Sequence, residues 1–118
     1  MPESTRGQLE ARISEAMIKF EKDYMGRGPE EAKTYILEDM VLVRLKGVLT
    51  PAEEHLSKSA EGADLIKRTR VQLLEDSRDL LEKLILEITG CPIKSLHTDI
   101  STKTGERIVI FILGKASQ

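Results

Sequence analysis

Two short apolar runs limit the folds open to this chain more than any other feature of its sequence. They are MVLVRL at residues 40–45 and RIVIFIL at residues 107–113. Each follows a turn signal, Glu-Asp in the first case and STKTGE in the second, and before each turn lies another strand-like run, at 35–37 and 93–100. The sequence therefore predicts two β-hairpins, and Gly105 can take the positive φ that the second turn needs.

The N-terminal stretch is predicted to be a helix that begins at Thr5, because the spacing from Thr5 to Gln8 fits a capping box. Apolar residues then recur at helical spacing as far as Tyr24. Gly26 stands where a left-handed helix cap is favoured, and Pro29 prevents the helix from resuming.

A second helical region follows the first hairpin. In LTPAEE, Thr50 is the expected N-cap, Pro51 the first helical residue and Glu53 the residue that completes a capping box. A weak point around Gly62 is expected to separate this short helix from a long one that runs to Ile88.

The resulting element order, α-ββ-αα-ββ, predicts the α+β class. We expect a four-stranded antiparallel sheet made of two β-hairpins, with the helices packed mainly on one face. At 118 residues the chain is expected to form a single domain over 1–118, with residues 1–4 disordered and 114–118 a frayed tail.

Helices on one face cannot cover every apolar side chain of these strands. Val41 and Val43 face one side of the sheet, whereas Met40 and Leu42 face the other. We expect MVLVRL to be a central strand that is covered on both sides. Either the helices wrap around the sheet or the bare face meets a second copy of the chain, and we favour a homodimer.

The amino-acid composition argues against nucleic acid and the membrane interior as binding partners. A net charge of -2 gives no general attraction to nucleic acid, and 3% aromatic residues without Trp provide no platform for stacking bases. No apolar run approaches the roughly 20 residues that span a bilayer. The single cysteine, Cys91, suits a reducing compartment. We therefore expect a cytoplasmic protein that binds no nucleic acid and does not insert directly into a membrane.

The segment YMGRGPEEAK, residues 24–33, can be interpreted in two ways. As a binding loop, its backbone N–H groups would form an anion-binding nest, to which Arg27 would add a planar guanidinium. As architecture, Gly26 would cap the helix and the remainder would lead into the first hairpin. The second interpretation is favoured because the loop follows a helix and does not precede one. It leaves Arg27 and Gly28 without a role.

Candidates for catalysis and metal binding are few. His97 and Asp99 have the same-face spacing of a strand, which would allow a hydrogen-bonded pair, but Cys91 is too far along the chain to be argued in as the nucleophile. Two histidines and one cysteine make a zinc site unfavoured. We therefore assign no catalytic residue, no metal and no cofactor, and expect the protein not to be an enzyme.

Two basic features differ in their expected roles. IKRTR, residues 66–70, opens the long helix and is followed by acidic residues, so we expect it to form a solvated face. Arg44 interrupts a strand that should be buried, where an unpaired guanidinium would be unfavourable by several kcal/mol. Arg44 should therefore have a carboxylate partner or face a pocket.

Three motifs carry a resemblance to a known family: GRGP at 26–29, GVLTPAE at 47–53 and TDISTKTGE at 98–106. In this combination, with a long helix between the second and the third, the chain resembles the MpsC-like family of small prokaryotic proteins over most of its length. That family takes its name from a Na+-translocating system that generates a membrane potential, has membrane proteins as its other components and is linked to inorganic-carbon uptake. The resemblance implies a soluble accessory protein and supplies no catalytic residue.

These observations lead to a main functional hypothesis and two alternatives. The main hypothesis is a non-enzymatic cytoplasmic accessory protein, associated through a transport-protein partner with a membrane cation-translocating or inorganic-carbon uptake system. The alternatives are an anion- or nucleotide-binding regulatory domain that uses the GRGP loop, and an enzyme centred on His97 and Asp99. The candidate ligand- or partner-binding residues are Tyr24, Gly26, Arg27, Gly28, Arg44, Thr50, Asp99 and Thr102.

Overall fold

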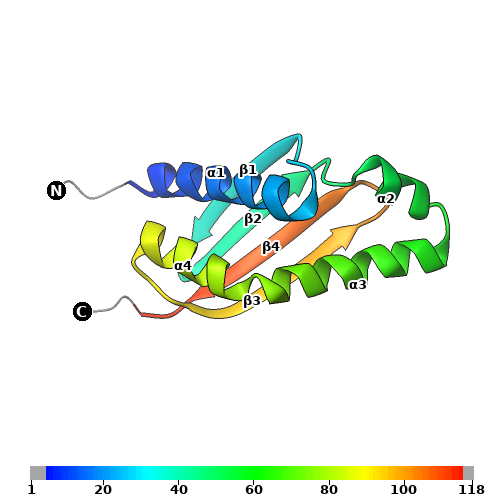
Figure 1. Ribbon diagram of the computed structural model, residues 1–118. Coiled ribbons are helices and arrows are strands. Elements are labelled where there is room, and N and C mark those ends of the chain that lie inside the picture. Colours follow the sequence, from blue (N-terminus) through cyan, green and yellow to red (C-terminus); the bar gives the residue numbers. More distant parts are fainter. Residues whose placement is uncertain (1–4, 116–118) are drawn as a thin grey trace.

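The computed structural model describes residues 5–115, and the predictions about residues 1–4 and 116–118 lie outside this part of the chain. Helices and hairpins alternate along it as the sequence predicts (Figure 1). The elements are α1 (Arg6–Met25), β1 (Glu31–Leu37), β2 (Met40–Lys46), α2 (Pro51–Leu56), α3 (Ala60–Asp76), α4 (Arg78–Thr89), β3 (Ile93–Ser101) and β4 (Glu106–Leu113).

The strands form one four-stranded antiparallel sheet in the order β1-β2-β4-β3. Each hairpin supplies one edge strand and one central strand. The two apolar runs of the sequence, in β2 and β4, pair with each other in the middle of the sheet, where Val43 lies opposite Val109. The predicted α+β class and the construction of the sheet from two hairpins are confirmed.

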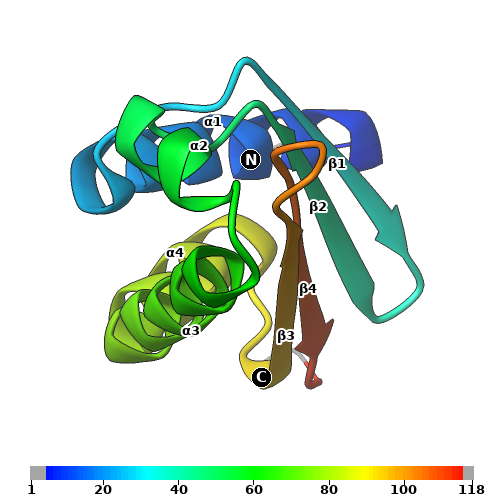
Figure 2. The same ribbon diagram turned by 90° about the vertical axis from the view of Figure 1, so that its right-hand side faces the viewer.

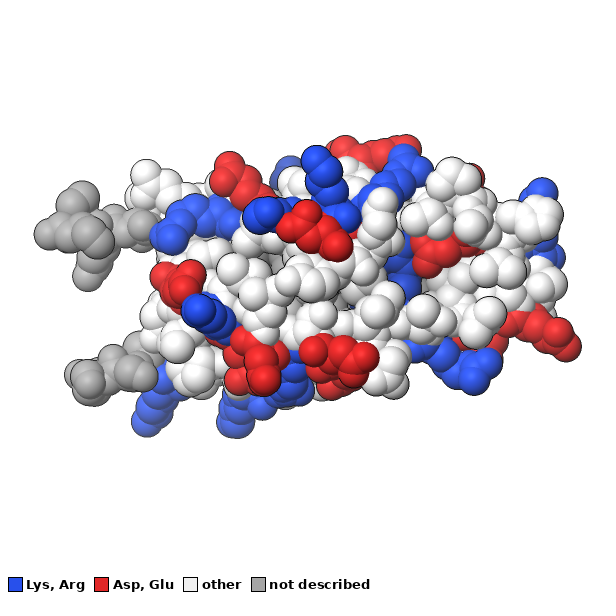
Figure 3. Space-filling model, viewed as in Figure 1, with Lys and Arg blue, Asp and Glu red and all other residues white. Residues whose placement is uncertain are grey.

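All the described helices lie on the same side of the sheet (Figure 2). Because side chains alternate along a strand, every second residue of β2 and β4 points at the helices and is buried there. On the outer surface of the helices, charges of both signs are interspersed (Figure 3). The core between the two layers is formed mainly by Ile13, Met17, Phe20, Val41, Val43, Leu45, Ile66, Leu74, Leu81, Ile85, Val109 and Phe111.

The helix boundaries agree with prediction wherever a capping residue signals them. Thr5 and Gln8 form a reciprocal capping box at the start of α1, and Thr50 and Glu53 form another at the start of α2. Gly26 caps the end of α1 with a φ of 90°. This left-handed conformation is readily adopted only by glycine.

Two details of the predicted helices are wrong. The expected long helix is broken at Ser77, where a φ of -99° and a ψ of 10° leave helical geometry and separate α3 from α4. The break between α2 and α3 lies at residues 57–59, and Gly62 lies within the first turn of α3. A Cβ at Gly62 would lie 1.9 Å from the carbonyl oxygen of Leu56, so this glycine permits the close approach of two helices.

The expected cover of β2 on both sides is found within this chain on one side only. β2 is a central strand, but the side of the sheet away from the helices, here named the open face, has no covering element within residues 5–115 (Figure 2). Met40 and Leu42 of β2, with Ile108, Ile110 and Ile112 of β4, belong to this face and are only half-buried. The sheet therefore keeps apolar side chains in contact with solvent.

Candidate functional site

The three motifs that carry the family resemblance lie together at one end of the molecule. The guanidinium of Arg27 donates from Nη1 to the carbonyl oxygen of Leu49 at 3.2 Å, which ties the GRGP loop to the β2–α2 loop. The N–H of Val48 donates to the carbonyl oxygen of Gly105 at 3.0 Å, which ties the β2–α2 loop to the β3–β4 turn. Residues 26–30, 46–50 and 101–105 together form this end of the molecule, the motif end.

Glycines allow these loops to approach one another closely. Gly47 has a φ of 66°, and a Cβ there would lie 2.6 Å from the side chain of Glu30. The N–H of Glu30 in turn donates to the carbonyl oxygen of Lys46 at 2.8 Å. Gly105 has a φ of 74° and lies against Gly47 and Leu49. The motif end is therefore held in one shape by its backbone.

Several predicted site residues lie at or beside the motif end. Tyr24 is 52% exposed in the last turn of α1 and stacks on Phe20, with ring centroids 5.1 Å apart. Arg27 is 3.5 Å from Glu30 in addition to its bond to Leu49, so its guanidinium joins two loops. Nothing in the structure requires a glycine at position 28, where an added Cβ would meet its nearest atom at an ordinary 3.8 Å.

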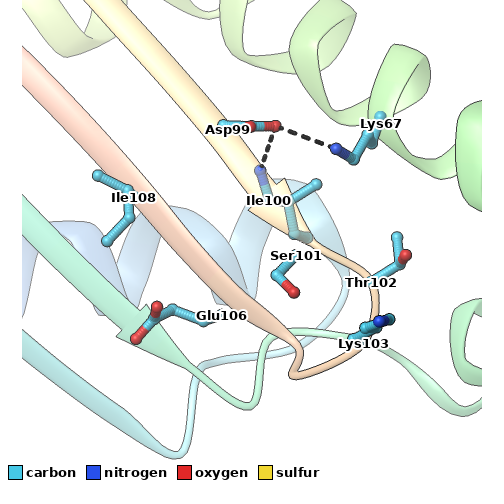
Figure 4. A pocket seen from close by; sticks show the side chains of 8 residues that line it. All are labelled: Lys67, Asp99, Ile100, Ser101, Thr102, Lys103, Glu106 and Ile108. Carbon is cyan, nitrogen blue, oxygen red and sulfur yellow. Dashed lines mark hydrogen bonds and ion pairs between the residues drawn. The ribbon is translucent and has the colours of Figure 1, made fainter.

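Two shallow clefts flank the β3–β4 turn. One, of about 290 Å³, opens between this turn and α2 and is lined by Glu30, Glu54 and Lys103 among others. The other, of about 380 Å³, lies beside β3 (Figure 4). Thr102 and Lys103 line both clefts, so the two clefts meet at the β3–β4 turn.

Asp99 and His97 lie on β3 but bind different groups. Asp99 accepts a hydrogen bond from the N–H of Ile100 at 2.8 Å and lies 3.6 Å from the ammonium of Lys67 (Figure 4). The Nε2 of His97 lies 3.3 Å from the hydroxyl of Ser95. Each side chain thus bonds to a partner other than the other one, and these contacts do not support a catalytic pair of His97 and Asp99.

Of the two predictions made for Arg44, a carboxylate partner is confirmed and burial is wrong. It does have the expected carboxylate partner, since its Nε donates to Glu106 on β4, and this hydrogen bond raises the pKa of the guanidinium. It is not buried, because it lies on the open face and its side chain is 47% exposed. The expected burial failed because the helices cover only the opposite side of β2.

A group of buried charges that the sequence analysis did not find lies directly behind the motif end. Glu21 of α1 is 0% exposed, and it accepts hydrogen bonds from Arg70 of α3 at 3.1 Å and from Arg107 of β4 at 3.2 Å. Arg70 also forms a two-pronged pair with Glu53 of α2, at 2.8 and 2.6 Å. Two carboxylates and two guanidiniums make this buried network neutral.

Backbone groups complete the buried network. Arg70 donates to the carbonyl oxygen of Val48 at 2.9 Å, and Arg107 donates to the carbonyl oxygen of Arg70 at 3.0 Å. Every buried side-chain nitrogen and oxygen within residues 5–115 has a hydrogen-bond partner. Buried charges persist only when they are paired in this way. Through Val48 and Glu53, the network holds the β2–α2 loop of the motif end in place.

The carboxyl groups of the network respond differently to their surroundings. Burial raises the pKa of Glu21, although both guanidiniums favour its ionised form. Burial acts in the same direction on Glu53, but hydrogen bonds from Arg70 and from the N–H of Thr50 outweigh it and lower the pKa of that carboxyl. A carboxylate that accepts several hydrogen bonds is stabilised in its charged form.

The signal for this network was present in the sequence. Arg70 lies four residues after Ile66 and four before Leu74, both buried, so it occupies the apolar stripe of α3 and not the solvated face expected for IKRTR. Arg107 is likewise on the same side of β4 as the buried residues Val109 and Phe111, because every second residue of a strand faces the same way. Arg70 and Arg107 therefore stood at positions that the pattern of their elements marks as buried.

Comparison with known proteins gives the chain a family. The model of the family described as "Na+-translocating membrane potential-generating system (MpsC)" matches residues 5–115. "Uncharacterized protein YbcI" of Bacillus subtilis (strain 168) is 49% identical over 109 residues, which cover 92% of this chain and 88% of that protein. "Uncharacterized protein YrhF" of the same organism is 26% identical over 105 residues, covering 87% and 85%.

No solved structure matches the chain. Among the helices of residues 5–115, none is long and apolar enough to cross a membrane. The family match spans all of the described residues, and with them the three motifs of the motif end and the whole buried network. The chain belongs to the MpsC family.

Proposed function

We propose that the protein is a non-enzymatic cytoplasmic accessory protein that binds a membrane component of a cation-translocating or inorganic-carbon uptake system through its motif end. The family description, which names a Na+-translocating system, supports the link to a membrane potential. The observation that carries the proposal is the convergence of GRGP, GVLTPAE and STKTGE on one surface, joined through Arg27, Val48 and Gly105.

The geometry of the motif end suits recognition of another protein. Its loops are tied by hydrogen bonds, and a surface that is already ordered loses less conformational entropy on binding. The cleft between the β3–β4 turn and α2 presents Lys103 beside Glu30 and Glu54, so it offers charges of both signs. A polar loop of a membrane protein that carries both signs fits such a cleft.

The alternative of an anion- or nucleotide-binding regulator is less well supported. An anion at the GRGP loop would have to compete for the guanidinium of Arg27 with the Leu49 carbonyl oxygen and the Glu30 carboxylate. Thermal melts in the presence of phosphate, bicarbonate and nucleotides test this alternative. A stabilisation by one of these anions that is lost in Arg27→Gln would favour the regulator over the accessory protein.

The proposal is tested in cells that lack the protein, by the membrane potential that they build in sodium medium. Lys103 is exposed in the motif end, and its replacement by Glu reverses a charge without touching the core. Lys103→Glu should fold normally and fail to restore the potential. Lys83→Glu makes the same change at an exposed position of α4, at the other end of the molecule (Figure 1), and should restore it. Full restoration by Lys103→Glu would exclude the motif end as the binding surface.

A further inference from the structure

The open face carries a continuous apolar cluster on three adjacent strands. The register places Leu42 of β2 beside Ile110 of β4 and beside Tyr35 of β1. Tyr35 and Leu37 are 38% and 55% exposed. The largest apolar patch on a protein surface is often an interaction site. The members of the cluster are Tyr35, Leu37, Met40, Leu42, Ile108, Ile110 and Ile112.

One end of the open face is charged, and this is the end next to the motif end. Arg44 of β2 is paired with Glu106 of β4, and Lys46 lies 3.3 Å from Glu31 of β1. The other end, beside the β1–β2 turn, is apolar and holds Leu37, opposite Met40 in the register. The face therefore changes from apolar to charged along the direction of its strands.

We propose that the open face binds a second copy of this chain, sheet against sheet, about a two-fold axis that runs along the strands. This axis keeps the charged ends of the two copies together and the apolar ends together. A two-fold axis across the strands would instead place Arg44 of each copy over the apolar end of the other, where a charge loses water without gaining a partner. The distribution of charge along the face thus selects the axis.

The same axis creates complementary charges between the two copies. It reverses the order of the strands, so β2 of each copy lies over β4 of the other. Arg44 then faces the β4 strand that holds Glu106 of the second copy, and both pairs form because a two-fold interface is self-complementary. Sheets pack about 10 Å apart, a gap that an arginine and a glutamate reaching from opposite sides can close.

The size of the face predicts how tightly the copies bind. With strands about 4.8 Å apart and about 3.3 Å per residue, the face covers roughly 19 by 23 Å. Two copies would bury somewhat more than about 900 Å² in total, which is at the low end for specific protein interfaces. We expect a dimer that forms at micromolar concentrations and is in equilibrium with the monomer.

This arrangement has a consequence that rests on the proposed function. A two-fold axis along the strands places both motif ends on the same side of the dimer. A membrane assembly with two copies of the binding component could engage both at once, which strengthens binding without any new contact. A dimer about the other axis would point its motif ends in opposite directions.

A charge exchange between two variants tests the dimer. Arg44→Glu leaves two acidic groups at this site, and Glu106→Arg leaves two basic groups, so each variant alone should be a monomer at concentrations where the unaltered chain is a dimer. An equimolar mixture of the two should recover a heterodimer, detected by native mass spectrometry and sedimentation velocity. Both residues are partly exposed, so both variants should keep the fold, which thermal melts verify.

Ile110→Ser provides a second, uncharged variant at the centre of the face and should weaken the dimer at least tenfold. Leu86→Ser makes a similar change at an exposed residue of α4, on the helical side, and should leave the dimer unchanged. A chain that stays monomeric throughout the micromolar range would overturn the proposal. So would two charge variants that do not associate when mixed, or a dimer that loses strength with Leu86→Ser and not with Ile110→Ser.

Spin-label distances test the direction of the axis, in a chain whose native cysteine is replaced by Cys91→Ser. One label is placed at Lys103→Cys in the β3–β4 turn and, in a separate sample, at Asp39→Cys in the β1–β2 turn at the opposite end of the sheet. An axis along the strands predicts short distances between equivalent labels in both samples. Distances longer by about a strand length, roughly 23 Å, in both samples would overturn this axis.

Discussion

Glu21 continues the buried stripe of α1, four residues after Met17 and four before Met25, although it is a carboxylate. Its two oxygens are used by Arg70 and Arg107, so three elements meet on one side chain. Such a group adds little net stability, because desolvation of the charges opposes their attraction. Removal of one member is unfavourable because it leaves the others buried without a partner.

Replacement of Glu21 by Gln should lower the free energy of unfolding by about 3 kcal/mol. The amide keeps one acceptor but turns an NH₂ group towards a guanidinium. Arg70 then has only Glu53 as a carboxylate partner, and Arg107 loses its carboxylate partner in the network. Urea unfolding measures the change. Glu15→Gln, at an exposed position of the same helix, is the matched control and should lie within about 0.5 kcal/mol of the parent chain. Equal stabilities for both variants would mean that the buried network does not hold the elements together.

Glu53 should make stability depend on pH. Its pKa is lowered in the folded chain, so the unfolded chain binds more protons in acid, and the stabilisation from Glu53 is present above its unfolded pKa of about 4.3 and is lost as the pH falls further. At pH 7, Glu53→Gln should be less stable than the parent chain by about 2 kcal/mol, because hydrogen bonds to a charged group are lost.

Urea unfolding of the parent chain and of Glu53→Gln at pH 7 and pH 3 measures this dependence. The difference between the two proteins should shrink at the lower pH. Glu54→Gln, at the next and exposed residue of α2, should show no comparable change. A difference that stays constant over this range would show that the ionised form of Glu53 is not the one that matters.

At the scale of helices and strands, the helix boundaries that depend on nearby residues were predicted correctly, and those that depend on distant parts of the chain were not. Thr5, Thr50 and Gly26 act within a few residues of themselves, so their roles as caps could be read from spacing alone. The break at Ser77 has no such marker, since Ser77 makes no side-chain capping bond. The role of Gly62 depends on where the preceding helix runs, which local pattern does not specify.

The two glycines of the GRGP loop should differ in their tolerance of a side chain. Gly26→Ala forces a Cβ into a φ of 90° and should reduce stability by about 1 kcal/mol. Gly28→Ala, two residues along, meets only ordinary contacts and should be close to neutral. Thermal melts of both variants decide the matter. A Gly28→Ala chain as unstable as Gly26→Ala would mean that the loop is packed more tightly than the structure shows.

At the scale of the whole molecule, the order of elements, the sheet of two hairpins and the one-sided helices could be predicted because each depends on periodicity and turns. The open face could be predicted only in part. Alternating apolar residues in β2 indicated that both sides of the sheet avoid water, yet pattern alone could not tell a covering helix from a second copy. In the structure the helices cover one side, and Arg44 with Glu106 marks the other.

The candidate site was predicted as separate motifs and became one surface only in three dimensions. Arg27 and Leu49 are brought together by pairing of β1 with β2, and Val48 and Gly105 by pairing of β2 with β4. The first pairing belongs to the predicted hairpin, although the bond from Arg27 was not foreseen. The second pairing depends on strand order, which could not be derived from spacing, so the contact between Val48 and Gly105 was not predictable. The buried network that supports this surface joins α1 to β4, which are the most distant elements of the chain.

The most direct test of the motif end as a binding surface is photo-crosslinking in living cells. A benzophenone side chain at position 103 should form an adduct with a membrane protein of the Na+-translocating system, identified by mass spectrometry of the membrane fraction. The same group at position 83, on α4, should form no such adduct. If the chain labelled at 103 restores the membrane potential but yields no adduct with a membrane protein, or if position 83 yields the same adduct, the motif end is not the surface by which this protein works.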